Sequence, residues 1–251
     1  QAPLINWQKL SKPVEPPLFH ESSPLTLRLI TIVCALLASN FEHVLAAQLD
    51  NVTALPGGSC RVKPLEKWSS QEKWVWKRIC EGEIADFNTA RAYGGSLYPK
   101  KLEWWSAKRA LRSQFLQTIL LFEPFRSALP QSGVRIVGAW FQEPMDLYNA
   151  TLAHPVALVG CRFERSVYFD LLKIPNYLIL NASKFNALLS MTGLKVAGVL
   201  EMKTGEFVDV DLGSAHIEHH LYMNDSNFTK SLNLNAAHIS GTLNMEQTTV
   251  A

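Results

Sequence analysis

The chain has 251 residues and a net charge of +2, with 47% hydrophobic and 18% charged residues. This balance is typical of a globular protein and excludes a disordered chain. The small net charge neither calls for nucleic acid nor forbids it, and we expect no specific nucleic-acid partner.

The first part of the chain, residues 1–47, is predicted to be an irregular segment that contains one apolar run. Residues 1–24 are rich in proline ("KPVEPPLF"), which favours flexible or irregular chain. Residues 29–38, "LITIVCALLA", follow Arg28 and resemble the core of a secretory signal, with a buried strand or helix as the alternative. The run is shorter than the roughly 20 apolar residues that span a bilayer.

Export would place a cleavage site after a small residue, Ala46 or Ala47. The first methionine is Met145, so we expect the true N-terminus to be missing or processed.

The four cysteines, Cys34, Cys60, Cys80 and Cys161, show no CxxC pair and no ligand-like spacing to histidine. We therefore expect no structural zinc site. In an oxidising compartment Cys60 and Cys80 could form a disulfide, and otherwise they are free thiols.

Residues 48–130 are predicted to be a helical cap region. The stretch 69–80, "SSQEKWVWKRIC", begins with serine and carries Glu72 just inside its start, which predicts a helix that closes near Gly82. Residues 84–99 contain two adjacent glycines and a proline, and they are predicted to form a loop.

A second, amphipathic helix is predicted over residues 107–122. Its apolar stripe consists of Leu111, Phe115, Ile119 and Phe122, opposite the basic residues Lys108, Arg109 and Arg112. The basic face is interpreted as solvated, with contact to an anionic membrane or nucleic acid as the alternative.

From Val134 onward the sequence divides into successive lines of eleven residues, with one line of ten at 200–209. The first, third and eighth positions are apolar in every line. Positions 1 and 3 lie two apart, as do 6 and 8, so each pair faces one side of a short extended segment. The pattern predicts strands and excludes helix. The eighth positions are Phe141, Leu152, Phe163, Ile174, Phe185, Val196, Phe207, Ile217, Phe228, Ile239 and Val250.

Phenylalanine alternates with aliphatic residues at the eighth position, which indicates coils of about 22 residues. Coils stacked at the strand spacing of about 4.8 Å place the phenylalanine rings in one column. Eleven lines then form a little over five coils, and the helix over 107–122 is expected to cap the first. Small sixth-position residues leave room for the rings, so Cys161 is interpreted as a core filler rather than a nucleophile. They are Ala139, Cys161, Ser183, Gly205 and Ser226.

The last line is incomplete after Val250 and leaves an open strand edge. We expect truncation, end-to-end association or further sequence there.

Two stretches of the repeat, "NATLAHPVALVGCRF" at 149–163 and "SAHIEHHLYMNDSNF" at 214–228, resemble variant pentapeptide-repeat units. Such units occur in bacterial proteins often labelled membrane-associated oxidoreductases, and "WVWKRICEGEIADFN" at 74–88 is similar to the region before their repeats. The resemblance implies a mainly β protein, a right-handed quadrilateral β-solenoid over 134–251 with an N-terminal α-helical cap region. It also implies a bacterial source and membrane association.

The oxidoreductase label transfers no residue to this chain. The stretch "GLKVAG" at 193–198 has the wrong spacing for a dinucleotide-binding turn and lies within the repeat. We therefore predict no catalytic residue and no cofactor.

One outward column stands out among the seventh positions of alternate lines: Thr151, Lys173, Lys195, His216 and His238. It is a candidate for binding an anionic polymer, phosphate groups or, at its two histidines, a metal ion, with a solvated surface as the alternative. Two imidazoles alone make a poor metal site, so no metal is predicted. In "SAHIEHH", Glu218, His219 and His220 fall in the turn, away from His216.

These features favour a non-catalytic scaffold or protein-interaction module of the bacterial cell envelope, exported or membrane-associated. The alternative is part of a membrane-associated enzyme whose catalytic residues the sequence does not identify. The expected partner is another protein or an anionic surface, or a second copy of the chain at the C-terminal coil.

Overall fold

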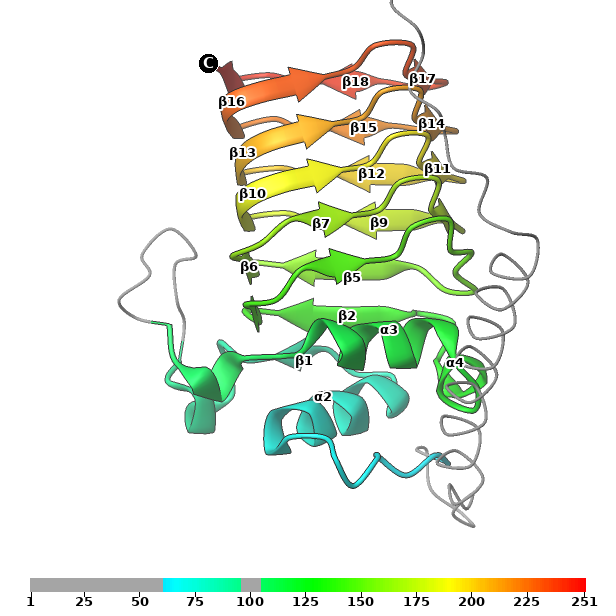
Figure 1. Cartoon of the computed structure of the whole chain (residues 1–251), viewed down its shortest axis with the longest axis vertical. Coiled ribbons are helices and arrows are strands. Elements are labelled where there is room, and N and C mark those ends of the chain that lie inside the picture. The colour runs from blue at the N-terminus through cyan, green and yellow to red at the C-terminus, as the bar shows by residue number, and fades with distance from the viewer. Residues whose placement is uncertain (1–60, 96–104) are drawn as a thin grey trace, which may run out of the picture. The chain divides into compact units, whose positions relative to one another are not determined.

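The computed structural model describes residues 61–95 and 105–251, all of which belong to one compact unit. Short helices lie at one end of a stack of β-coils (Figure 1). The predictions for residues 1–47, for Cys34 and for Cys60 lie outside the described residues.

The first predicted helix is confirmed as α2 (Ser70–Cys80). Ser69 caps it, because its Oγ accepts from the Glu72 N–H at 3.2 Å while Glu72 Oε2 accepts from the Ser69 N–H at 2.8 Å. This reciprocal pair is the predicted capping box. Gly82, with φ of +78°, follows the helix and turns the chain toward the coils.

The prediction of a second helix over residues 107–122 is wrong for its first part. Residues 107–109 form a 3-10 turn, η4 (Ala107–Arg109), and the α-helix α3 begins six residues later than predicted and spans Ser113–Leu121. Between them the backbone is extended, and the Leu111 N–H donates to the Trp140 carbonyl at 3.0 Å. Because this backbone pairing with the first coil replaces helical hydrogen bonds, residues 110–112 stay extended.

The side-chain pattern of this segment changes accordingly. Arg109, predicted on a solvated basic face, is fully buried, and Phe122, predicted on the buried stripe, is 41% exposed. Phe115 and Ile119 are buried as predicted. A continuous basic helix face is therefore absent from residues 107–122. A short helix, α4 (Phe125–Ala128), follows.

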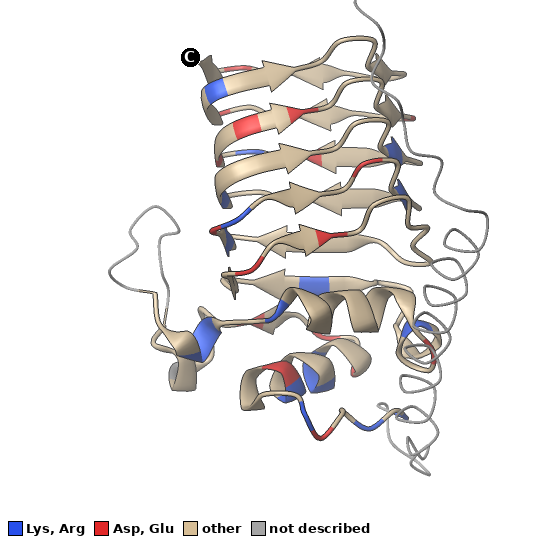
Figure 2. Cartoon of the chain, viewed as in Figure 1, with Lys and Arg blue, Asp and Glu red and all other residues tan. Residues whose placement is uncertain are grey.

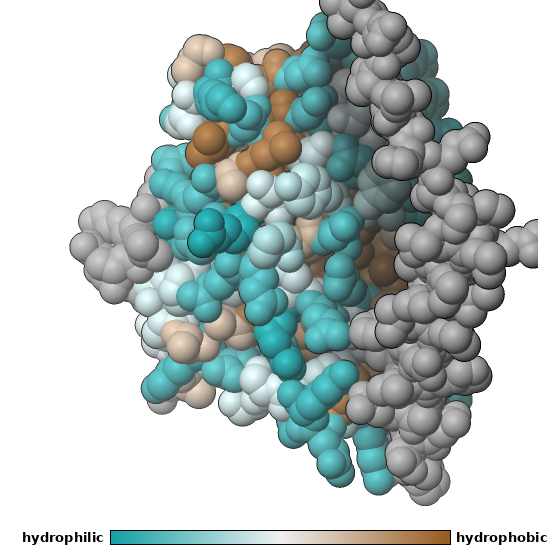
Figure 3. All heavy atoms as spheres, in the orientation of Figure 1, coloured by the Kyte–Doolittle hydropathy of each residue, from teal (hydrophilic) through white to brown (hydrophobic). Residues whose placement is uncertain are grey.

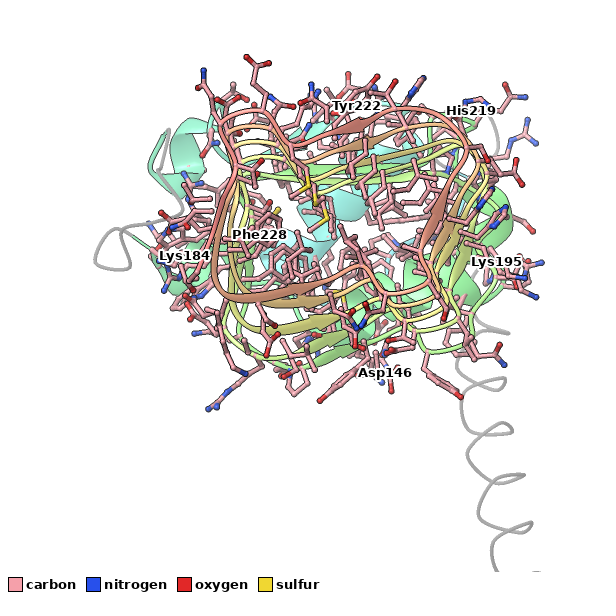
Figure 4. All side chains as sticks on the ribbon, turned by 90° about the horizontal axis from the view of Figure 1, so that it is seen from above. Asp146, Lys184, Lys195, His219, Tyr222 and Phe228 are labelled. Carbon is pink, nitrogen blue, oxygen red and sulfur yellow. The ribbon has the colours of Figure 1, made fainter. Side chains whose placement is uncertain are left out.

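The repeat forms parallel strands on four sides of a quadrilateral coil (Figure 4). One sheet contains β1 (Ala85–Asp86), β2 (Val134–Val137), β5 (Val156–Val159), β9 (Tyr177–Ile179), β12 (Val199–Glu201), β15 (Leu221–Tyr222) and β18 (Leu243–Asn244). A second contains β3 (Trp140–Phe141), β6 (Arg162–Phe163), β10 (Lys184–Ser190), β13 (Glu206–Asp211), β16 (Asn227–Asn233) and β19 (Thr249–Val250), with β4 (Met145–Asp146) and β7 (Val167–Tyr168) around its corner. The third contains β8 (Lys173–Ile174), β11 (Lys195–Val196), β14 (His216–Ile217) and β17 (His238–Ile239).

Residues paired between neighbouring coils are 22 apart, as in Val134 with Val156, and 21 apart across the line of ten, as in Leu200 with Leu221. The predicted β-solenoid of about five coils is confirmed. The strand β1 corrects the loop predicted over 84–99, because Ala85 and Asp86 add a rung beside β2. A 3-10 turn, η2 (Arg91–Tyr93), follows it.

The helices and the coils share one hydrophobic core, in which α2 packs on β1 and β2 and α3 packs on β4. That the helical region caps the first coil stays a prediction.

The predicted phenylalanine column runs through this core. Ring centroids of successive phenylalanines are 4.9, 4.2, 5.3 and 5.2 Å apart from Phe141 to Phe228, and the rings are stacked. A Cβ at Gly205 would lie 2.5 Å from the Phe207 ring, which is why this position is small. Cys161 is buried, and burial raises the pKa of its thiol to about 12, which confirms it as a core filler.

A feature that sequence reasoning missed is the fifth position of every line, which adopts a left-handed backbone with φ between 53° and 72°. It is the third residue of a tight turn that requires positive φ, a conformation that costs non-glycine residues about 1 kcal/mol or more. Only three of these residues are glycine. They are Gly138, Asn149, Gly160, Leu171, Ala182, Gly193, Thr204, Ser214, Asp225, Ala236 and Gln247.

Thr204→Gly is expected to raise the free energy of unfolding by about 0.5–1 kcal/mol, because it removes a β-branched residue from the left-handed region. Gly160→Ala should lower it by a similar amount through the backbone alone, since a Cβ there meets no atom within 4 Å. Urea unfolding of both variants checks the pair. Equal changes of the same sign would contradict this account of the turn.

Candidate functional site

The candidate site is the lysine–histidine column, formed by Thr151, Lys173, Lys195, His216 and His238. Strand pairing joins Lys173 to Lys195, Lys195 to His216 and His216 to His238, and an isolated bridge joins Thr151 to Lys173. The structure thus brings the predicted residues together on one face, with Lys195 on the outer side of the coil (Figure 4). Their role in binding stays a prediction.

The position of the column follows from strand alternation. Ile174, Val196 and Ile217 point into the core and are at most 3% exposed. The residue before each of them must point outward, because successive side chains in a strand face opposite sides. All four charged or imidazole members of the column are exposed.

The two lysines of the column differ from the other three lysines in the coils. Elsewhere, Lys184 pairs with Glu206 at 3.0 Å, Lys203 with Glu201 at 2.9 Å and Lys230 with Asp209 at 2.6 Å. Within residues 61–95 and 105–251, Lys173 and Lys195 form no ion pair. Strand β11 and the coil beneath it carry blue segments in Figure 2. Like charges on adjacent rungs repel one another unless an anion lies between them.

A shallow groove of about 280 Å³ lies along the column. A second row of side chains lies one strand position beyond the inward residues and consists of Pro175, Ala197 and Glu218. Sequence reasoning missed this row, although the ninth positions of alternate lines contain the signal. Figure 3 shows hydrophilic and hydrophobic atoms mixed on the face where β10, β13 and β16 lie.

As predicted, His216 lies beside His238 in the column, whereas His220 lies at the corner of the coil. The rings of His216 and His238 stack with centroids 4.7 Å apart and planes 15° apart, and His238 Nε2 lies 3.3 Å from Ser240 Oγ. At the corner, His220 stacks instead on Tyr222, with centroids 5.5 Å apart. No group of three or more potential metal ligands occurs in the described part of the chain.

A second hollow, of about 220 Å³, lies beside α2 and includes Glu72 and Arg112. Glu72 is 1% exposed, and its carboxylate accepts from Arg112 Nε at 2.9 Å and Nη2 at 2.5 Å. Burial alone would raise the pKa of Glu72, but hydrogen bonds from Arg112 and from the Ser69 N–H outweigh it and lower the pKa. These charges satisfy one another, which indicates a structural pair that fastens α2 to the segment before α3.

No family model, curated protein or solved structure matches this chain. The repeat β-solenoid is therefore established by the structure, while the narrower pentapeptide-repeat resemblance stays a prediction. No helix within residues 61–95 or 105–251 is long and apolar enough to cross a membrane.

Proposed function

We propose that the protein is a non-catalytic β-solenoid scaffold of the bacterial cell envelope that presents columns of side chains to a partner. The observation that carries this proposal is the register of the coils, which aligns the outward residues of β8, β11, β14 and β17 in one column. Rigid secondary structure holds binding groups more accurately than loops do. The stacked phenylalanines beneath the faces support such rigidity.

Export across a membrane is supported by Cys80, which is disulfide-bonded. Disulfides persist in oxidising compartments and are rare where thiols are kept reduced. The predicted partner, Cys60, lies outside the described residues, so this pairing remains part of the proposal. Peptide mapping without reduction identifies the partner, and a fully reduced Cys80 in protein isolated from its native cells would argue against export.

Self-association through the last coil is the second part of the scaffold proposal. Strands β17, β18 and β19 each pair with a described strand on one side only, and Leu243 and Val250 are 42% and 49% exposed. A parallel strand from another copy could satisfy these backbone groups and cover the apolar side chains. Further coils of a longer chain would do the same.

Sedimentation over a range of concentrations tests this part. The wild-type chain is expected to form concentration-dependent assemblies, and Leu243→Lys should weaken them because a buried, unpaired charge at the contact is costly. Tyr168→Lys, on a different face and 39% exposed, is the control. A chain that stays monomeric at all concentrations would contradict self-association, and a bound chromophore in the absorbance spectrum would contradict the non-catalytic scaffold.

A further inference from the structure

We propose that the lysine–histidine column binds a linear acidic glycan, seated along the solenoid axis with its carboxylate or sulfate groups on Lys173 and Lys195. This inference rests on the proposed scaffold function, because it names the partner that binds to one face of the scaffold.

Charge is the first argument. Each of the other coil lysines has a carboxylate within 3.0 Å, whereas Lys173 and Lys195 have none among the described residues and occupy adjacent rungs. Their backbones are about 4.8 Å apart at the usual strand spacing. An anionic group between the two ammonium groups would remove their mutual repulsion and form two charge-assisted hydrogen bonds.

The shape of the groove is the second argument. Beside the lysines runs a narrow strip that contains Pro175 and Ala197, which have no polar side-chain atoms. Such a strip fits the C–H face of a sugar ring, while the lysines meet the substituents on the edge of the ring. One sugar unit and its linkage are close in length to one rung, so both lysines can reach anionic groups on the same unit or on neighbouring units.

The ends of the groove favour a glycan over a uniformly charged polymer. Thr151 lies at one end, and His216 and Glu218 lie at the other. The Glu218 carboxylate would repel a further anionic group but accepts hydrogen bonds from sugar hydroxyls. The groove therefore suits a chain in which acidic groups and hydroxyls occur together.

Nucleic acid and membrane surfaces fit less well. Single-stranded nucleic acid is held by aromatic side chains on which bases stack, and the groove has no phenylalanine, tyrosine or tryptophan among its lining residues. Recognition of anionic membranes typically uses clusters of four to eight basic residues, and this groove offers two lysines.

The test is titration of the full chain with polygalacturonate, heparin, neutral dextran, single-stranded DNA and phosphatidylserine vesicles. The wild type is expected to bind one or both acidic glycans, more weakly as salt rises, and not the other three. Lys173→Gln/Lys195→Gln should lower the affinity about 30-fold, since it removes two charge-assisted contacts. The matched control is Lys184→Gln/Lys203→Gln, which removes the same charge from other faces and should change affinity less than threefold.

Equal losses in the two double variants, binding to neither acidic glycan, or tighter binding to DNA or vesicles would each overturn the proposal. Circular dichroism and the sedimentation assay are run on the same samples. Absent glycan binding with intact self-association would reject this inference alone, whereas loss of both would reject the scaffold function as well.

Discussion

Phe185→Ala is expected to lower the free energy of unfolding by about 3–5 kcal/mol. Phe185 is 1% exposed, and its ring stacks between Phe163 at 4.2 Å and Phe207 at 5.3 Å. The cavity cannot close easily, because the backbone on each side is held in register with a neighbouring coil. Urea unfolding measures the effect.

Phe122→Ala is the matched control, since that phenylalanine is 41% exposed and lies outside the column. It should cost about 1 kcal/mol or less. Hydrogen exchange should also show faster opening of the coils next to the Phe185 cavity, because each coil is stabilised mainly by its neighbours. Equal losses in the two variants would contradict the role assigned to the stacked rings.

Arg109→Met is expected to lower the free energy of unfolding by at least about 3 kcal/mol. The buried guanidinium donates to the carbonyls of Tyr93 at 3.0 Å, Gly138 at 3.2 Å and Phe87 at 3.3 Å, and also to Gly95. Removing it takes this donor away from two buried and two partly buried carbonyl contacts. These bonds attach the segment 87–95 to the first coil, so the loss should be accompanied by faster proteolysis within that segment.

Arg109 Nη1 also donates to Asn88 Oδ1 at 2.8 Å. This contact explains why the adjacent coil residue, Gly138, is a glycine. A Cβ at Gly138 would lie 2.8 Å from Asn88 Oδ1 and 2.9 Å from Arg109 Nη1. Arg165→Met, at an exposed arginine, is the control and should change stability by about 0.5 kcal/mol or less. Similar losses at both arginines would mean that Arg109 does not organise this region.

The sequence predicted the coils well because the repeat records one physical constraint many times. Inward positions must be apolar in every line, so the register that aligns Phe141 with Phe163 can be counted from the residues alone. The left-handed fifth position was not predicted, because the turn tolerates residues as different as Leu171 and Thr204 and leaves no uniform signal.

The segment before the coils shows why periodicity can mislead. Leu111 fits an apolar helical stripe opposite Arg109, but the Leu111 N–H donates to the carbonyl of Trp140. Trp140 lies far along the chain, so a local pattern does not contain this contact. In the candidate site, too, the repeat predicts one part, whereas another part depends on contacts between residues far apart in the sequence. The column of Lys173 and Lys195 followed from the repeat, whereas the lack of an ion pair to either lysine among the described residues depends on which residues occupy the neighbouring columns.

Disulfide cross-linking tests the central claim, the one-rung register of the lysine–histidine column on which the scaffold and its binding face depend. Lys173→Cys/Lys195→Cys places two thiols on paired residues. Their expected Cα separation of about 4.8 Å lies within the range that a disulfide spans. Lys184→Cys/Lys195→Cys is the control, because these residues lie on opposite sides of the coil although they are closer in sequence (Figure 4).

Under mild oxidation, followed by peptide mass mapping, the first variant should form the intramolecular disulfide and the second should not. A cross-link in the control variant, or none in the first, would contradict the stacked-coil account.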